Sequence, residues 1–322
     1  MAIRVLDGVT PSPLERLVDD YLSHCQARGL SPRTLENSYG YSLRVVFLSW
    51  CAEEGINDIR ELDGRAVDRF TSSLLQRRKE GQPISPHTVH SYVRPVRQML
   101  TWATRMGEDV RAKPQLPKLS MPLRETLTRD EVDLMEKVLD SERDKLIIRI
   151  FCDCGLRLDE LTQLSPTDIV RSGRQAHLRV LGKGSRVRGV PIPPQLLRRL
   201  ERHIDGRPVD RSADRIFLGL RRGPLGRFDA LTRSGVYQVV KDAVYRASIT
   251  KRVYPHLLRH SWMTEMLRGG MSPIQLSIIA GASIQVITEH YTHLTKDDAY
   301  EAMIRVLTAR RTQPPDAQPV TR

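Results

Sequence analysis

Cysteine is scarce in this sequence of 322 residues. The four cysteines are Cys25, Cys51, Cys152 and Cys154, and the close pair at 152 and 154 has no second pair of ligands, so it matches no zinc-binding pattern. We therefore interpret all four as buried thiols in apolar helices. The sequence also lacks a Walker-type phosphate loop and an acidic metal-binding cluster. The sequence therefore gives no indication of a metal site or a nucleotide cofactor.

Long apolar runs are missing as well. No run approaches the roughly 18 residues of a membrane span, and residues 1–10 lack the apolar core of a signal peptide. Hydrophobic residues still make up 40% of the chain, which is enough for a normal core. The length suffices for two domains of ordinary size. These features favour a soluble cytoplasmic protein.

Acidic residues are outnumbered, and the formal net charge is +13. Most of the basic excess lies after residue 120, and arginine is far more frequent than lysine. Arginine suits bidentate contact with phosphate groups. The charge therefore predicts a polyanionic partner such as nucleic acid, although many basic proteins bind none.

Apolar residues at helical spacing dominate residues 12–107. Ser31-Pro32 starts one helix that runs to Gly55, and Ser85-Pro86 starts another that runs to Gly107, because serine caps helices and proline favours their first position. Two further helices are indicated by apolar residues at helical spacing: Leu14, Leu17, Val18, Tyr21, Leu22 and Cys25, and Val67, Phe70 and Leu74. Together these patterns predict an N-terminal four-helix domain.

A second domain is predicted after residues 108–124, a segment that contains three prolines and is typical of an extended linker. Thr128 and Glu131 form a capping box that starts a new helix. The glycine-rich turn 182–185 separates two β-prone runs, 177–181 and 186–192, and predicts a hairpin. Further helices are predicted at about 194–204, 234–248, 256–268, 273–280 and 296–310, before a tail at 312–322 that we expect to be disordered. The predicted fold class is mainly α with a small β-hairpin or sheet.

Five polar residues lie in short motifs that could act on a phosphate group. Arg157 follows the glycine that ends an apolar helix, and Lys183 lies in the predicted hairpin turn. His256 and Arg259 are three positions apart near a helix start, so they share one face and could both donate to an anion. Tyr291 stands in the motif His-Tyr-Thr-His. Taken alone, Arg157, Lys183 and Tyr291 are more simply explained as ordinary surface or packing residues, and for His256 and Arg259 that explanation is as good as the functional one.

The order and spacing of these motifs, taken together, resemble the tyrosine recombinases of the phage integrase family. The matching motifs are Gly-Leu-Arg-x-x-Glu-Leu at 155–161, His-x-Leu-Arg-His at 256–260 and Tyr-Thr-His at 291–293. The resemblance covers nearly the whole chain and has an Xer-like two-domain layout. Residues 12–107 are similar to the family's helical core-binding domain, which binds DNA. Residues 125–311 are similar to its mixed α+β catalytic domain.

The resemblance implies a site-specific recombinase that cleaves and rejoins DNA. Tyr291 would attack a phosphodiester and form a 3′-phosphotyrosyl intermediate. Arg157 and Arg259 would clamp the non-bridging oxygens of that phosphate. His256 would assist by hydrogen bonding and proton transfer, and Lys183 would protonate the leaving 5′-oxygen.

Three further positions complete the comparison with the family. Glu160 resembles the supporting acidic residue that orients the arginine region, and His260 resembles a structural residue. Ala282 departs from the pattern, because the family usually has His or Trp at that position as a hydrogen-bond donor or packing residue. Either the site works with one donor fewer, or a neighbour such as Ser283 or His290 replaces it.

The implied partners are double-stranded DNA with specific recombination sites and three further copies of the chain in a synaptic tetramer. The motifs are compatible with phage integration, transposition and chromosome-dimer resolution alike. Two other hypotheses remain open at this point: a type IB topoisomerase-like enzyme that relaxes supercoils, and a catalytically weak DNA-binding relative.

Overall fold

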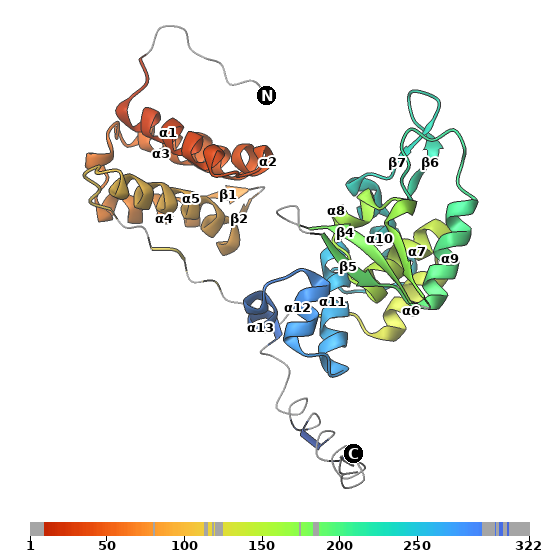
Figure 1. Ribbon diagram of the computed structural model, residues 1–322. Coiled ribbons are helices and arrows are strands. Elements are labelled where there is room, and N and C mark those ends of the chain that lie inside the picture. The colour runs from red at the N-terminus through yellow and green to blue at the C-terminus, as the bar shows by residue number, and fades with distance from the viewer. Residues whose placement is uncertain are drawn as a thin grey trace, which may run out of the picture. The chain divides into compact units, whose positions relative to one another are not determined.

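The computed structural model describes residues 10–79, 81–112, 115–117, 119, 125–173, 175–182, 187–291, 300, 303–304 and 308, and no side chain between 289 and 299. The contacts within the chain divide it into two units, Met1–Pro122 and Leu123–Arg322. Figure 1 labels most of the helices and strands of both units.

The first unit is built from helices. Its elements are α1 (Pro13–Ala27), α2 (Pro32–Thr34), η1 (Leu35–Phe47), α3 (Leu48–Glu53), η2 (Ile59–Glu61), α4 (Gly64–Gln76), the short strands β1 (Arg78–Lys79) and β2 (Gln82–Pro83), and α5 (Pro86–Arg105). The segments α2, η1 and α3 follow one another without a break, and η1 has π-helical hydrogen bonding. The predicted helix from Ser31-Pro32 is therefore confirmed, as is the one that starts at Ser85-Pro86.

Serine caps set the starts of three helices in this unit. The hydroxyl groups of Ser12, Ser31 and Ser85 accept the backbone amide three residues further on, at 3.1, 3.2 and 3.2 Å. Proline follows each serine and presets the backbone angle of the first helical residue. Local chemistry thus fixes where these helices begin, as the sequence indicates.

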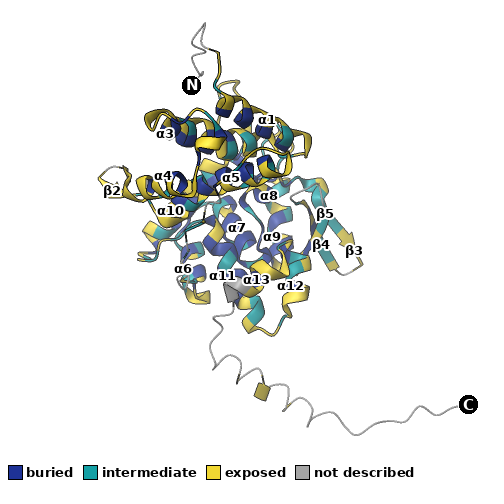
Figure 2. Cartoon of the chain, turned by 90° about the vertical axis from the view of Figure 1, so that its left-hand side faces the viewer, coloured by how far each residue is buried: buried dark blue, intermediate teal, exposed yellow. Residues whose placement is uncertain are grey.

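The core of the first unit is closed by aromatic contacts between helices. Phe47 and Phe70 are both buried, and their rings meet edge to face with centroids 5.3 Å apart. The ring of Trp50 also packs against Phe70, with the same distance between ring centroids. Buried positions line the inner faces of the helices, as the dark blue segments of Figure 2 show. This packing fixes the positions of the helices that bear the basic side chains described below.

The second unit combines helices with a small antiparallel sheet. Its elements are α6 (Arg129–Lys137), α7 (Glu142–Arg149), η3 (Ile150–Cys154), α8 (Leu158–Gln163), η4 (Pro166–Asp168), β3 (Ile169–Ser172), β4 (Gln175–Leu181), β5 (Val187–Pro191), α9 (Pro194–Asp205), β6 (Leu218–Arg222), β7 (Phe228–Ala230), α10 (Arg233–Arg246), α11 (Pro255–Arg268), α12 (Pro273–Ala280) and α13 (Ile284–Tyr291). Strands β3, β4 and β5 pair in that order.

Most predicted elements of this unit are confirmed. Strands β4 and β5 form the predicted hairpin, with Val180 paired to Arg188. Helices α9, α10, α11 and α12 match the four predicted between 194 and 280 within a few residues. The third strand, β3, and the hairpin β6–β7 were not predicted, because these strands are short and, in the latter case, irregular in register. The predicted last helix lies mostly outside the described residues, as does the tail at 312–322.

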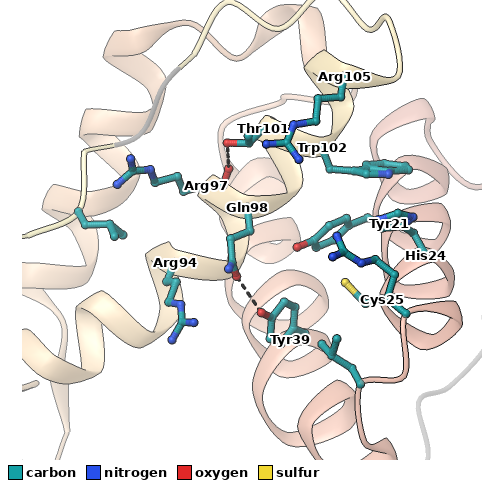
Figure 3. A pocket seen from close by; sticks show the side chains of 13 residues that line it. Tyr21, His24, Cys25, Tyr39, Arg94, Arg97, Gln98, Thr101, Trp102 and Arg105 are labelled. Carbon is teal, nitrogen blue, oxygen red and sulfur yellow. Dashed lines mark hydrogen bonds between the residues drawn. The ribbon is translucent and has the colours of Figure 1, made fainter. Parts of the chain in front are cut away.

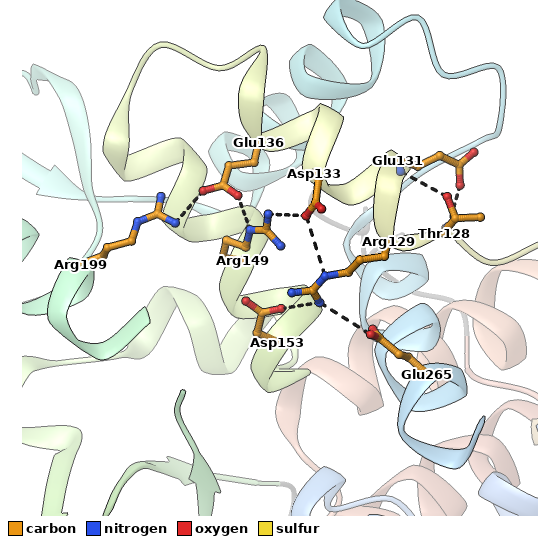
Figure 4. Close-up of polar contacts among 9 residues, drawn as sticks. All are labelled: Thr128, Arg129, Glu131, Asp133, Glu136, Arg149, Asp153, Arg199 and Glu265. Carbon is orange, nitrogen blue, oxygen red and sulfur yellow. Dashed lines mark hydrogen bonds and ion pairs between the residues drawn. The ribbon is translucent and has the colours of Figure 1, made fainter. Parts of the chain in front are cut away.

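Ion pairs between helices hold the start of the second unit together, as Figure 4 shows. Arg149 of α7 has a side chain only 13% exposed, and it binds Glu136 of α6. Arg199 of α9 binds the same carboxylate at 2.6 Å. Arg129 of α6 reaches Asp153 of η3 at 3.0 Å. This network fixes the helix that leads into the candidate site.

The four cysteines are buried and free, which confirms their interpretation as buried thiols. Burial raises the pKa of Cys51 to about 12 and also raises the pKa of Cys152 and Cys154, so these thiols stay protonated and unreactive. The described residues contain no group of three or more His, Cys, Asp or Glu side chains placed to hold a metal ion. Within the same residues, no helix has both the length and the apolar character that crossing a membrane requires.

Candidate active site

The first part of the site is a sharp turn between η3 and α8. Gly155 follows η3 with φ +60° and ψ +35°, in the left-handed region that favours glycine. A Cβ atom at this position would overlap the buried ring of Trp262 on α11. Arg157 then takes the position just before α8 with extended backbone angles. The turn therefore places Arg157 close to the helix that carries His256 and Arg259.

Glu160 is the buried acidic group of the site, with its side chain only 3% exposed. It accepts the backbone amide of Arg157 at 2.7 Å and the Nη1 of the same residue at 2.8 Å. It also accepts both Nη atoms of Arg188, at 2.7 and 2.8 Å. Burial alone would raise the pKa of Glu160, but the hydrogen bonds from the two arginines lower it overall. The carboxylate stays ionised and fixes the guanidinium of Arg157.

The C-terminal end of α12 gathers three arginines. Arg188 donates from Nε to the carbonyl group of residue 279 at 2.7 Å. Arg259 donates to the carbonyl of residue 280 at 2.5 Å, and Arg157 donates to the carbonyl of residue 281. The last carbonyl groups of a helix have no partner within it, and they carry its negative dipole end, so they attract cations. Backbone groups thus bring together Arg157 and Arg259, which lie far apart in the sequence.

Arg259 is held from two sides and is only 5% exposed. Besides the carbonyl of Ala280, it donates to the carbonyl of Gly155 at the turn before Arg157. His256 lies one turn earlier on α11 and is exposed, whereas His260 is partly buried. A cation fixed in this way can stabilise negative charge on a nearby phosphate group.

The side chains of two predicted site residues, Tyr291 and Lys183, lie outside the described part of the structure. Tyr291 is the last residue of α13, the helix that follows the arginine-bound end of α12 after three residues, but its side chain lies outside the described part. Lys183 lies outside the described residues altogether, in the interval between β4 and β5. The structure therefore assembles Arg157, Glu160 and Arg259, and it places the backbone of Tyr291 at the end of the adjoining helix.

Comparison with known proteins identifies the fold and the class of enzyme. Residues 125–298 match the model of the phage integrase family, which is more than half of the chain. This chain belongs to the phage integrase family. It is a tyrosine site-specific recombinase.

Relatives of this recombinase cover nearly its whole length. Tyrosine recombinase XerD of Corynebacterium glutamicum is 29% identical over 301 residues, which cover 88% of this chain and 95% of the relative. Tyrosine recombinase XerA of Thermococcus onnurineus is 30% identical over 291 residues, which cover 90% and 94%.

Solved structures share the fold at lower identity. XerH recombinase in a pre-cleavage complex with its difH substrate superposes with a TM-score of 0.68 at 19% identity, covering 92% of this chain and 97% of XerH. The integrase of transposon Tn1549, in complex with transposon right end DNA, has a TM-score of 0.69 at 18% identity, covering 92% and 99%. The predicted fold class, a helical unit followed by a mixed α+β unit of the recombinase type, is confirmed.

The structure shows the surroundings of Ala282, the position at which we expect from the sequence a departure from the family pattern. Ala282 is half buried against the cluster around Trp262, and its carbonyl accepts the hydroxyl of Ser277 at 2.9 Å. The hydroxyl oxygen of Ser283 accepts the amide of Val286 at 3.2 Å, so Ser283 caps the start of α13. The side chain of His290, the other candidate donor, lies outside the described part.

Sequence reasoning missed one residue of the recombinase site, Arg188. It pairs across the hairpin with the buried Val180, and so lies on the inward face of β5. A charged residue on a buried strand face needs a partner of opposite charge. The period of two along the predicted strand is the signal that could have found it.

The turn at Gly155 leads to a stability prediction for the recombinase. We expect Gly155→Ala to destabilise the second unit by about 2–4 kcal/mol, because the left-handed backbone costs roughly 1–2 kcal/mol and overpacking against Trp262 adds about as much. Gly173→Ala is the matched control, since its φ is +58° and a Cβ there would meet nothing within 4 Å. Urea unfolding of the two variants measures the difference. Equal losses would show that contact with Trp262 contributes nothing.

Proposed function

We propose that this recombinase cuts and rejoins double-stranded DNA at specific sites through Tyr291. The observation that carries the proposal is the arginine pair of Arg157 and Arg259, anchored on consecutive carbonyl groups just before the helix that ends at Tyr291. The tyrosine oxygen forms a bond to phosphorus while the bond from phosphorus to the 5′-oxygen breaks. A 3′-phosphotyrosyl link and a free 5′-hydroxyl result, and the reverse step rejoins the strand without ATP.

The residues around the phosphate have distinct tasks in this proposal. Arg157 and Arg259 stabilise the negative charge that grows on the non-bridging oxygens, because fixed cations need no rearrangement during the reaction. His256 accepts the proton of the Tyr291 hydroxyl, and Lys183 gives a proton to the leaving 5′-oxygen. Glu160 keeps Arg157 in place, and His260 has a structural role. No step requires a metal or a cofactor.

Trapping the covalent intermediate tests this function. In a duplex with a nick close to the cleavage site, cleavage releases the short oligonucleotide that carries the 5′-hydroxyl. Rejoining needs that hydroxyl, so it is blocked, and the protein stays attached to the DNA. We expect a protein–DNA adduct on a duplex that carries the natural site and none on a scrambled duplex. Relaxation of supercoiled DNA of any sequence, without exchange between two DNA sites, would instead indicate a topoisomerase-like activity.

Lys183 provides a second test of the chemistry. We expect Lys183→Ala to slow cleavage by about 10²-fold or more, the usual contribution of a positioned general acid. A substrate with sulfur in place of the 5′-bridging oxygen needs no proton to leave, so the defect should largely disappear on it. Single-turnover rates on both substrates measure the effect. An equal defect on the two substrates would place Lys183 in DNA binding only.

We propose that residues 12–107 form the DNA-binding domain of the recombinase and residues 125–311 its catalytic domain, with 108–124 as a linker. A basic cavity of about 560 Å³ in the first unit supports this role, as Figure 3 shows. Its lining contains Arg28, Arg94, Arg97 and Arg105 but no acidic residue. Within the described residues, none of these four arginines forms an ion pair with a carboxylate. Their charge is available to neutralise DNA phosphates.

The salt dependence of DNA binding tests this surface. Each phosphate contact contributes about −0.9 to the slope of log affinity against log salt concentration. We expect the double variant Arg94→Gln/Arg97→Gln to bind DNA more weakly and to have a slope shallower by roughly 1–2. Arg69→Gln is the control, because Arg69 is already paired with Glu54 at 3.1 Å. Slopes equal to that of the unaltered protein would exclude this cavity from the DNA interface.

The working form of the recombinase is proposed to be a homotetramer on two DNA sites. Exchange between two duplexes needs four strand cleavages, and each chain supplies one Tyr291. Four identical subunits can close into a ring through one repeated head-to-tail contact. The mass of the complex formed with two sites, measured in solution, distinguishes a tetramer from independent dimers.

A further inference from the structure

Arg188 has no task in the reaction proposed above, yet its side chain donates three hydrogen bonds around the site. It lies on β5, five residues after Lys183, and its side chain is only 11% exposed. Its two Nη atoms bind the two carboxylate oxygens of Glu160 at 2.7 and 2.8 Å. Its Nε donates to the carbonyl of Ile279 at 2.7 Å. One guanidinium therefore joins β5, α8 and the end of α12.

Glu160 links Arg188 to Arg157, because the same carboxylate binds both residues. Each oxygen of Glu160 receives one hydrogen bond from each arginine: Oε1 from Nη1 of both, and Oε2 from Nη2 of Arg188 and from the backbone amide of Arg157. A carboxylate that is only 3% exposed is costly unless its oxygens are satisfied. Removal of Arg188 would leave Glu160 half satisfied and free to turn toward other donors. The guanidinium of Arg157 would then lose its fixed orientation.

The end of α12 also depends on Arg188. The carbonyl that it binds belongs to Ile279, directly before the carbonyl groups that bind Arg259 and Arg157. Gly281 has φ +61°, and a Cβ there would lie 3.1 Å from Cδ, Nε and Nη1 of Arg188. The glycine therefore leaves room for the guanidinium against the backbone. This close fit sets the distance between β5 and the segment that leads into α13.

We propose that Arg188 is a positioning residue for strand cleavage. Through Glu160 it holds Arg157 on the scissile phosphate, and through Ile279 it ties the strand after Lys183 to the backbone that precedes the helix of Tyr291. The proposal rests on the proposed function, because it requires Arg157 to contact that phosphate.

The test compares a normal scissile phosphate with a methylphosphonate, in which a methyl group replaces one charged non-bridging oxygen. The two diastereomers are used separately, so each non-bridging oxygen is removed in turn. On the normal substrate, we expect Arg188→Gln to slow single-turnover cleavage by about 10–100-fold, the usual effect of losing a supporting contact. The Kd for DNA should stay within a few-fold, because Arg188 does not reach the DNA surface in this proposal.

The substrate change separates positioning from general structural support. One methylphosphonate diastereomer is expected to remove the effect of Arg157→Ala on the cleavage rate. On that diastereomer, Arg188→Gln should also slow cleavage by no more than a few-fold. The double variant Arg157→Ala/Arg188→Gln should cleave the normal substrate no more slowly than Arg157→Ala alone. Equal defects of Arg188→Gln on all substrates, or additive defects in the double variant, would overturn the positioning role.

Two further variants keep the outcome decisive. Arg179→Gln is the control on the neighbouring strand, where Arg179 forms an exposed ion pair with Asp168 at 3.2 Å, and its cleavage rate should be unchanged. If Arg188→Gln fails to fold, Arg188→Lys keeps one charged contact to Glu160 but loses the paired geometry, and the same substrate dependence is expected. If Arg157→Ala cleaves the unmodified phosphate at the rate of the unaltered protein, the proposed function is overturned. The contact of Arg188 with Glu160 would not be affected by that result.

Discussion

Replacing Tyr291 with phenylalanine should abolish DNA cleavage while leaving the protein folded and bound to DNA. The change removes only the phenolic oxygen, which forms the bond to phosphorus in the proposed reaction. Loss of a catalytic nucleophile typically lowers the rate by about 10⁴-fold or more, whereas the lost oxygen contributes little to DNA affinity. The amount of covalent adduct on a nicked duplex measures cleavage, and a mobility shift on the intact duplex measures binding.

The control for this experiment is Tyr300→Phe, because Tyr300 is an exposed tyrosine nine residues further along the chain. Its adduct yield should equal that of the unaltered protein. A covalent adduct formed by Tyr291→Phe would show that another residue is the nucleophile. Loss of DNA binding together with loss of cleavage would place Tyr291 in recognition rather than chemistry.

Replacing Arg259 with lysine should slow cleavage by about 10³-fold even though the positive charge is kept. Arg259 spans the carbonyl groups of Gly155 and Ala280 with two nitrogen atoms of one planar group. Lysine carries a single ammonium group and has no planar fork to bridge two fixed acceptors and a phosphate. Single-turnover cleavage at saturating DNA measures the chemical step separately from binding.

Arg268→Lys on the same helix is the matched control, because Arg268 is exposed in the last turn of α11. Its cleavage rate should stay within about twofold of the unaltered protein, as expected for surface substitutions. Circular dichroism and thermal unfolding of both variants show whether the fold is kept. A folded Arg259→Lys variant that cleaves at the normal rate would remove Arg259 from the phosphate-binding pair.

The starts of the helices could be predicted from local sequence because their causes are local. Ser31 and Ser85 cap helices within three residues, and Thr128 caps α6 through Glu131 in the same way. The hairpin of β4 and β5 followed from two β-prone runs around a glycine-rich turn. By contrast, β3 is only four residues long and is held in the sheet by its pairing with β4, which no local pattern reveals.

The sequence alone determined the candidates for the reacting groups: Arg157, Lys183, His256, Arg259 and Tyr291 stand in motifs that resemble one enzyme family. Their roles stay a prediction, because the side chain of Tyr291 and all of Lys183 lie outside the described residues.

Only the tertiary structure decided how the arginines are held. The acceptors of Arg157, Arg188 and Arg259 include backbone carbonyl groups at the end of α12, and every residue type has a carbonyl group, so no side-chain pattern marks these acceptors. The contact of Arg188 with Glu160 likewise joins a strand to a helix 28 positions away in the sequence. Such contacts arise from packing between distant segments, which the spacing of residues along the chain does not encode.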